Sequence, residues 1–274
     1  MAADFGPLVS ADWLAAHLDE VQVVDVRWYL DGRSGWDAYR AGHIPGAVWL
    51  DVDTDLSAPA SPAAGRHPLP TEAAFAAALA RMGIAEGRPV VAYDDAGGSV
   101  AARLWWMLRA IGEPAAVLDG GLAAWTDHAG ELSTDVPTPL LTERAPRPWP
   151  SDRFLTADEL AASSALVFDA RSAERYAHGD PAIDPRPGHV PGARSAPWTG
   201  NLDEHGRFLA PDVLRARFAG AEDGAIAYCG SGVTACHDLL AMTVAGHTEL
   251  ALYPGSWSQW GADESRPAET GLAP

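Results

Sequence analysis

Short apolar runs alternate with amphipathic stretches along the chain, a pattern typical of parallel β-sheets covered by helices. In the first half the apolar runs predict strands at Val21–Val26, Val90–Tyr93 and Ala115–Leu118. Amphipathic spacing predicts helices between them, at residues 71–82 and 99–111, and a short helix capped by Ser10 precedes the first strand. We therefore expect an α/β fold with small, mostly parallel sheets.

Two other stretches of the first half lack a clear period. Residues 28–41 are rich in aromatic side chains and are expected to form a loop, and residues 51–70 are polar and contain several prolines.

The second half repeats the order of elements in the first. Gly188–Ala193 repeats the Gly-His-hydrophobic-Pro-Gly-Ala turn at Gly42–Ala47, and the glycine-initiated helix ending at Trp260 repeats the one ending at Trp125. Residues 133–152 are rich in proline and lack periodicity, as linkers do. We therefore expect two tandem copies of one domain, at 1–132 and 153–274, joined by a linker at 133–152.

Features present in both copies are expected to serve the fold. Each copy has an Asp-x-Arg sequence at the end of its first long strand, at Asp25/Arg27 and at Asp169/Arg171. We interpret these as ion pairs at the strand ends, and the histidines of the repeated turns, His43 and His189, as turn residues.

Features present in one copy are candidates for function. Cys229 follows the strand Ala225–Tyr228, and the aligned residue of the first copy is Asp94. Since an aspartate cannot act as a sulfur nucleophile, the first copy is expected to be inactive. Arg175 also occurs in one copy only, because the aligned residue of the first copy is Asp31.

Composition narrows the function further. The chain has 274 residues, 47% of them hydrophobic, a net charge of −18, and 19 basic residues that are all arginine. Such acidity disfavours attachment to nucleic acid or to an anionic membrane. No segment reads as a leader or a membrane span, and the two cysteines, Cys229 and Cys236, do not suggest a disulfide framework, so we expect a cytoplasmic protein.

The loop after Cys229 offers a particular chemistry. Backbone N–H groups of Gly230–Ala235 and the start of the following helix can stabilise a thiolate or another anion. A cysteine phosphatase loop would need an arginine at the sixth position after the cysteine, where this chain has Ala235. A metal site is also disfavoured, because Cys236 and His237 alone do not complete a ligand set around Cys229. Cys236 is interpreted as a buried structural cysteine.

These features together resemble the tandem-domain rhodanese sulfurtransferases over nearly the whole chain. The resemblance rests on the duplicated turns, the paired Asp-x-Arg sequences, the Gly-Ser-Trp-x-x-Trp helix and the loop Cys-Gly-Ser-Gly-Val-Thr-Ala. That loop is similar to those of 3-mercaptopyruvate sulfurtransferases, whereas thiosulfate enzymes typically carry a basic pair after the cysteine. The resemblance implies that Cys229 carries a persulfide and that no cofactor is needed.

The resemblance also implies roles for residues outside the loop. Arg175 corresponds to an arginine that holds the substrate carboxylate, and Arg186 is the candidate nearest to the family's second arginine. A Ser-His-Asp relay proposed for mercaptopyruvate enzymes corresponds to Ser231, His67 and Asp53. The loop residues Gly230, Gly232, Val233, Thr234 and Ala235 would contribute to substrate binding.

The expected reaction is sulfur transfer from 3-mercaptopyruvate through a Cys229 persulfide to cyanide or a thiol, such as thioredoxin or a small thiol, with release of pyruvate. Two alternatives stay open at this point. One is thiosulfate:cyanide sulfur transfer by the same cysteine, and the other is a non-catalytic persulfide carrier loaded by a partner enzyme.

Overall fold

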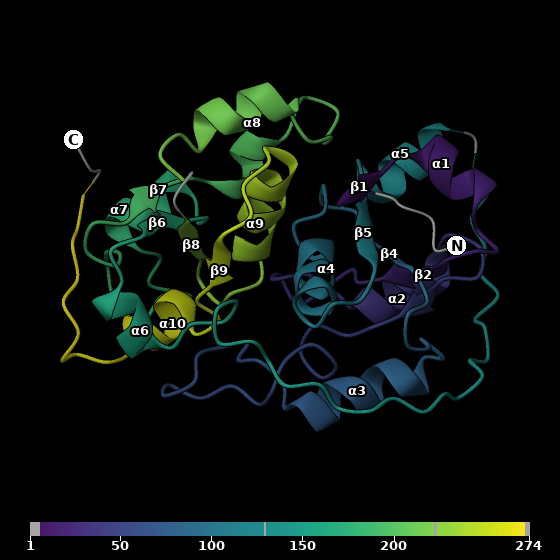
Figure 1. Ribbon diagram of the computed structural model, residues 1–274, viewed down its shortest axis with the longest axis horizontal. Coiled ribbons are helices and arrows are strands. Elements are labelled where there is room, and N and C mark those ends of the chain that lie inside the picture. The colour runs from purple at the N-terminus through teal and green to yellow at the C-terminus, as the bar shows by residue number, and fades with distance from the viewer. Residues whose placement is uncertain (1–5, 129, 222–223, 272–274) are drawn as a thin grey trace. The chain divides into compact units, whose positions relative to one another are not determined.

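The computed structural model describes residues 6–128, 130–221 and 224–271 (Figure 1). Its chain forms two compact units. The first contains Met1–Ser57, Pro70–Trp149 and Glu204–Phe208, and the second contains Ala58–Leu69, Pro150–Asp203 and Leu209–Pro274. Each unit therefore includes one short segment from the opposite half of the sequence.

The first unit is built on a parallel five-stranded sheet in the order β1-β5-β4-β2-β3. Its elements are β1 (Leu8–Val9), α1 (Ala11–Ala16), β2 (Gln22–Asp25), α2 (Gly35–Ala41), β3 (Val48–Trp49), α3 (Glu72–Arg81), β4 (Val90–Tyr93), α4 (Ala101–Ala110), β5 (Ala115–Leu118) and α5 (Gly121–Asp127).

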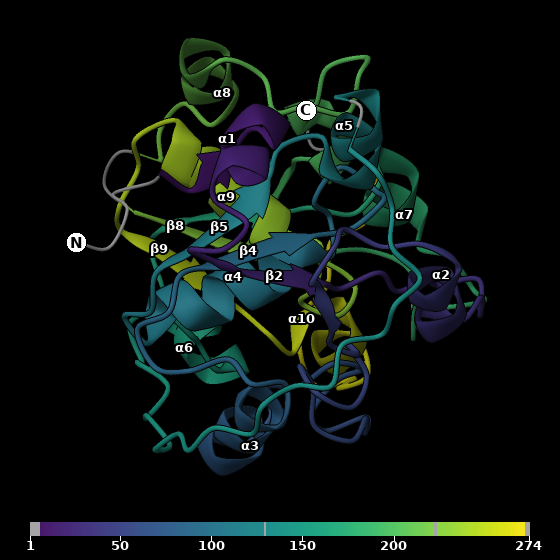
Figure 2. The same cartoon turned by 90° about the vertical axis from the view of Figure 1, so that its right-hand side faces the viewer.

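Alternate strand residues of this sheet face opposite helical layers. Val91 and Tyr93 of β4 share a buried cluster with Leu14 of α1, Tyr39 of α2 and Trp125 of α5. Helix α4 packs along β4 and β5, and Figure 2 shows it on the opposite side of the strands from α1 and α5. The loop after β4, which begins at Asp94, therefore starts from a central strand buried on both faces.

The second unit contains a parallel four-stranded sheet in the order β7-β6-β8-β9. Its elements are α6 (Ala157–Ala162), β6 (Leu166–Asp169), α7 (Ala173–His178), β7 (Arg194–Ser195), the 3-10 helix η1 (Trp198–Asn201), α8 (Pro211–Arg217), β8 (Ala225–Tyr228), α9 (Ala235–Val244), β9 (Leu250–Leu252) and α10 (Ser256–Trp260).

The core of the second unit repeats that of the first. Ile226 and Tyr228 of β8 share a buried cluster with Leu160 of α6, Tyr176 of α7 and Trp257 of α10. Helix α9 packs on β8, β9 and α8, and Figure 1 shows α8 and α9 on the other side of these strands. The loop that starts at Cys229 thus leaves the central strand β8, as the loop at Asp94 leaves β4.

The strands predicted at 90–93, 115–118 and 225–228 are confirmed with the same bounds, and the helices at 71–82 and 99–111 are confirmed but are two and three residues shorter, respectively. The prediction of a loop throughout residues 28–41 was wrong, because α2 occupies Gly35–Ala41. The Ser34 hydroxyl caps α2 by accepting from the Asp37 N–H at 3.0 Å.

Residues 133–149, within the predicted linker, group with the first unit. They form no helix or named strand, yet they are tied down by several bonds. Ser133 and His43 exchange backbone hydrogen bonds, and the buried Arg144 forms a 2.8 Å salt bridge with Glu113. Most of this stretch is therefore bound to the first unit. The domain limits expected from the sequence, 1–132 and 153–274, stay a prediction.

Candidate active site

Cys229 lies directly after β8, 2% exposed, at the start of the loop that leads into α9. Its Sγ accepts hydrogen bonds from the backbone N–H groups of Ser231, at 3.4 Å, and Gly232, at 3.1 Å. Two amide dipoles are thus directed at the sulfur, and the ten-residue helix α9 begins at the end of the same loop, at Ala235. This arrangement favours a negative charge on the sulfur.

The rest of the loop is shaped to make this turn. Gly232 has φ +78°, and a Cβ at that position would lie 2.6 Å from the Pro254 carbonyl oxygen. Only glycine fits there without moving backbone. Val233 is buried, Thr234 precedes α9, and Ala235 is its first residue.

A second loop, which opens α10, holds the cysteine in place. The Ser256 hydroxyl accepts from the Cys229 N–H at 3.1 Å, and the Cys229 carbonyl accepts from the Trp257 N–H at 2.9 Å. Ser256 has φ +52°, and it is the one non-glycine residue with positive φ in the described part of the chain. Such a conformation is costly for serine and is found most often near functional sites. Ser256 is not among the site residues predicted from the sequence.

The segment 58–69 of the first half is fastened to the same loop. The Ser258 hydroxyl accepts from the Arg66 N–H at 3.0 Å, and the side chain of Gln259 donates to the Ala63 carbonyl at 2.6 Å. A Cβ on Gly65 would lie 2.7 Å from the Gly255 carbonyl oxygen, so this approach requires a glycine.

This fastening brings His67 to the cysteine loop. Its Nδ1 forms a 2.8 Å hydrogen bond with Ser231 Oγ, and both side chains are buried, at 6% and 8% exposure. The structure therefore brings together Ser231 and His67, two members of the relay implied by the resemblance.

Asp53, the third member, belongs to the first unit. There its carboxylate accepts from the Trp28 indole N–H at 2.8 Å. Its part in a relay stays a prediction.

Arg175, on α7, lies beside Gly230. Asp184, whose side chain is 2% exposed, binds its guanidinium through Nε at 3.0 Å and Nη2 at 2.5 Å. A bidentate carboxylate fixes the plane of a guanidinium. Asp184 also lies 3.7 Å from Arg171, so this carboxylate orients the cation that faces the loop.

Arg66 is a second cation at the loop, and it is not among the site residues predicted from the sequence. A Cβ on Gly230 would lie 2.7 Å from Arg66 Nη2 and 2.8 Å from Arg175 Nη2. Burial lowers the pKa of Arg66, as do the neighbouring guanidinium groups of Arg175 and Arg171, whereas Cys229 and Asp184 act in the opposite direction. The absence of a side chain at position 230 thus leaves room for two guanidinium groups.

Arg186 is directed elsewhere. Its Nη2 donates to the carbonyls of Arg266, at 2.7 Å, and Asp263, at 3.3 Å, and its guanidinium lies 5.8 Å from the centre of the Trp257 ring. These contacts fasten the segment after α10. A binding role for Arg186 stays an untested prediction.

In the first copy the corresponding loop holds its own anion. Asp94, which is fully buried, accepts four backbone hydrogen bonds of 2.8 Å, from Ala96 and Gly98 to Oδ1 and from Val100 and Ala101 to Oδ2. A carboxylate therefore occupies the place where the second copy has a thiol.

The features shared by both copies are structural, as predicted. The strand-end pairs are confirmed, with 2.6 Å between Arg27 and Asp25 and 2.7 Å between Arg171 and Asp169, all buried. The turn histidines are also confirmed, since His43 and His189 are buried and stack on the tyrosine of the preceding helix.

Behind the loop, α9 carries several buried polar groups. Cys236 donates to the Gly232 carbonyl at 3.4 Å and forms no disulfide. Asp238 accepts from the Asn201 amide at 2.7 Å through Oδ1, while its buried Oδ2 has no hydrogen-bond partner. Burial raises the pKa of Asp238 to about 8.

The described residues contain neither a metal-binding cluster nor a membrane-spanning helix. No group of three or more histidine, cysteine, aspartate or glutamate side chains there is arranged to hold a metal ion. No helix among them has the length and apolar character needed to span a bilayer.

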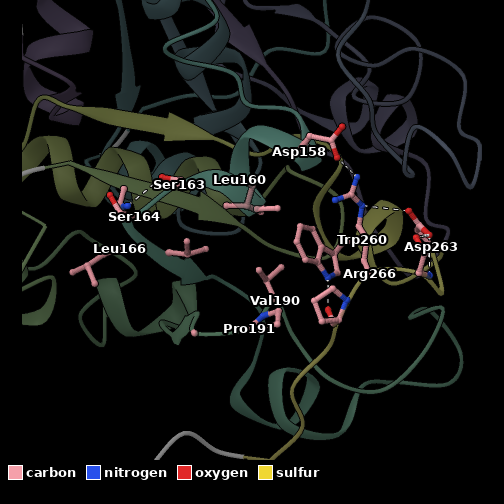
Figure 3. Close-up of a pocket in the computed structure, with 16 residues that line it drawn as sticks. Asp158, Leu160, Ser163, Ser164, Leu166, Val190, Pro191, Trp260, Asp263 and Arg266 are labelled. Carbon is pink, nitrogen blue, oxygen red and sulfur yellow. Dashed lines mark hydrogen bonds and ion pairs between the residues drawn. The ribbon is translucent and has the colours of Figure 1, made fainter.

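A separate pocket of about 620 Å³ lies between α6, β6 and the segment after α10 (Figure 3). Its charged side chains are already paired, since Arg266 binds Asp158 at 2.6 Å and lies 5.0 Å from the centre of the Trp260 ring. None of the residues from Cys229 to Ala235 line it. We assign it no part in the site.

Comparisons with known proteins agree with this architecture. The family model for the rhodanese-like domain matches residues 10–128 and 156–263. The chain is 41% identical to a probable 3-mercaptopyruvate sulfurtransferase of Pseudomonas aeruginosa, covering 96% of this chain and 98% of the relative. It is 37% identical to the 3-mercaptopyruvate sulfurtransferase of Escherichia coli, covering 95% and 97%.

Among solved structures, 3-mercaptopyruvate sulfurtransferase from Leishmania major is similar with a TM-score of 0.83 and 32% identity, covering 96% of this chain and 76% of that one. Two matched domains, two parallel sheets and near full-length similarity lead to one assignment: the chain belongs to the tandem-domain rhodanese family of sulfurtransferases.

Proposed function

We propose that this enzyme transfers sulfur from 3-mercaptopyruvate, through a Cys229 persulfide, to a thiol or cyanide acceptor. The observation that carries the proposal is the buried Cys229 sulfur, held by two loop N–H groups beside the guanidinium of Arg175 and the Ser231–His67 hydrogen bond. The names of the relatives at 37% and 41% identity support the choice of donor.

In the first half-reaction the Cys229 thiolate attacks the sulfur of 3-mercaptopyruvate. A sulfur–sulfur bond forms, the carbon–sulfur bond breaks, and its electron pair leaves on the enolate of pyruvate. The enolate then takes up a proton to give pyruvate. Arg175 holds the donor carboxylate, and Ser231, positioned by His67, donates a hydrogen bond to the ketone oxygen as negative charge develops there.

In the second half-reaction an acceptor attacks the outer sulfur of the persulfide. The bond between the two sulfurs breaks, and Cys229 leaves as a thiolate that the loop N–H groups stabilise. A thiol acceptor becomes a persulfide, and cyanide becomes thiocyanate. The cycle is therefore ping-pong, with sulfur as the transferred group.

Thiosulfate is the second candidate donor, because two guanidinium groups beside Gly230 could also bind a dianion. Intact-mass analysis after incubation with each donor tests the proposal. We expect 3-mercaptopyruvate to add one sulfur atom to the wild type and to the Cys236→Ser variant, and to leave Cys229→Ser unchanged. A higher kcat/KM for thiosulfate would favour the second donor, and an unmodified wild type would leave only the carrier role.

A further inference from the structure

Helix α10 carries two polar side chains that its counterpart in the first copy lacks. Ser258 and Gln259 stand where the corresponding helix, α5, has Ala123 and Ala124. In both copies a backbone N–H of this helix binds the carbonyl of the residue that begins the neighbouring loop, at 2.9 and 2.8 Å. Because the first copy makes this backbone bond without the two polar side chains, they are candidates for a function of the copy that carries Cys229.

Ser258 joins two segments of the second unit. Its N–H donates to the Gly230 carbonyl at 2.9 Å, and its hydroxyl accepts from the Arg66 N–H at 3.0 Å. The hydroxyl also donates to a carbonyl at the start of α10, at 3.0 Å, which fixes its orientation. Gly230 directly precedes Ser231 in the chain, and Arg66 directly precedes His67. One residue therefore sets the separation of the two segments that form the Ser231–His67 hydrogen bond.

Gln259 holds segment 58–69 at a second point. Its Nε2 donates to the Ala63 carbonyl at 2.6 Å, and its Oε1 accepts from the Tyr253 hydroxyl at 2.8 Å. The tyrosine thus determines which end of the amide faces the segment. Gly255 leaves the room that this amide needs, since a Cβ there would lie 1.7 Å from Gln259 Oε1. Its φ of −61° suits any residue, so the close approach of the amide is what requires a glycine.

Between these two points the segment makes a tight turn. Ser61 and Gly65 exchange backbone hydrogen bonds of 3.1 and 2.8 Å. The turn is therefore braced internally as well as against α10, and His67 follows it after one residue. A hydrogen bond weakens steeply as its geometry departs from the optimum, so the contact between His67 and Ser231 depends on how firmly the turn is held.

We propose that Ser258 and Gln259 are positioning residues for the reaction. They hold segment 58–69 on the cysteine loop, so that His67 orients the Ser231 hydroxyl. Their effect on sulfur transfer passes through His67. This inference rests on the proposed function for the role of His67, whereas the fastening of the segment is independent of any donor.

The first experiment gives the two positions the residues of the first copy. Ser258→Ala, Gln259→Ala and the double variant are assayed for sulfur transfer from 3-mercaptopyruvate to cyanide. Ser265→Ala is the control, because it removes a hydroxyl bond of the same unit, to Asp263 at 2.6 Å. We expect kcat to fall about threefold in each single variant and about tenfold in the double variant, with a smaller change in KM. The control should stay within about twofold of wild type.

The second experiment tests whether the loss passes through His67. In a His67→Ala background, the double substitution at Ser258 and Gln259 should lower kcat by less than about twofold, because the side chain that they position is already absent. A general distortion of the loop would lower kcat by the same factor in both backgrounds. Each assay is run at a temperature at which thermal unfolding shows the variant to be folded.

The third experiment needs no donor. Hydrogen–deuterium exchange of peptides covering residues 58–69 should be faster in the double variant than in the wild type, since the Arg66 N–H loses its acceptor and the Ala63 carbonyl loses its donor. Peptides covering β4 of the first unit should be unchanged. If 3-mercaptopyruvate proves not to be a donor, the proposed function fails, while faster exchange of this segment still supports its fastening by α10.

Three outcomes would overturn the inference. One is a double variant with the kcat of the wild type, even if residues 58–69 exchange faster. Another is a loss of kcat that is as large in the His67→Ala background as in the wild type. The third is unchanged exchange of residues 58–69 in the double variant, which would mean that other contacts hold the segment.

Discussion

Asp94 accepts four backbone N–H groups from the loop that follows β4, whereas Cys229 accepts two from the loop that follows β8. Both residues are buried at the end of a central strand. One loop is thus filled by a carboxylate of its own, whereas the other directs two N–H groups at a cysteine sulfur.

Asp94→Ala should destabilise the protein strongly. The substitution leaves four buried N–H donors without their acceptor, and we expect the free energy of unfolding to fall by about 3 kcal/mol or more. Urea denaturation monitored by tryptophan fluorescence measures the change. Asp94→Asn, which keeps one acceptor oxygen, should lie between the alanine variant and the wild type. A loss below about 1 kcal/mol in Asp94→Ala would show that water replaces the carboxylate.

Ser231 and His67 should act as one unit. Ser231→Ala and His67→Ala are each expected to lower kcat by about tenfold to a hundredfold, because each removes the positioned hydrogen bond at the ketone oxygen. The double variant should be little worse than either single variant. Additive losses in a steady-state double-mutant cycle would mean that the two residues contribute separately, despite their 2.8 Å contact.

Two glycines of the loop should respond differently to alanine. In Gly230→Ala the new Cβ meets only the side-chain ends of Arg66 and Arg175, so both guanidinium groups must shift from their present places, and the KM should rise several-fold with little loss of stability. In Gly232→Ala the Cβ meets the Pro254 carbonyl at a position with φ +78°, so the melting temperature should fall by several degrees. Equal melting temperatures of the two variants would contradict this distinction.

Asp238 should make stability depend on pH. Its pKa is raised from 3.8 to about 8 in the folded protein by burial, so between about pH 4 and pH 8 the folded state binds a proton that the unfolded state has released. Stability from this group is therefore present below pH 4 and is lost as the pH rises toward 8. Urea denaturation at pH 5.5 and pH ~7.5 measures the loss, which has an upper limit of about 1.4 kcal/mol per pH unit. Asp238→Asn should lose less unfolding free energy than the wild type over the same pH interval. If its free energy of unfolding falls with pH as steeply as that of the wild type, Asp238 is not the titrating group.

The central strands and the long helices could be predicted from the sequence. A strand buried on both faces leaves a continuous apolar run, and a helix buried on one face leaves a periodic apolar pattern. Helix α2 could not be predicted in this way. Its seven residues include aromatic side chains and make too few helical turns for the apolar period of a helix to be visible in the sequence. Strands β1, β3 and β7 have two residues each, and their pairing depends on neighbours distant in the chain.

The candidate site also contains residues that the local sequence indicates and residues that only the folded chain brings there. Cys229, Ser231 and Arg175 could be identified from local sequence, because a turn before a helix and a difference between two copies are visible in the chain. Arg66 could not, since its position beside the loop depends on Gly65 packing against Gly255, almost two hundred residues later. Ser256 also gave no local signal, because its positive φ appears only in the folded chain.

Segment 58–69 belongs to the compact unit of the second half, although the gene encodes it within the first. A recombination event at the junction of the two halves would transmit Cys229 without Arg66 and His67. The chain contains two similar domains, but the unit that carries Cys229 is completed by a segment from the first half of the sequence.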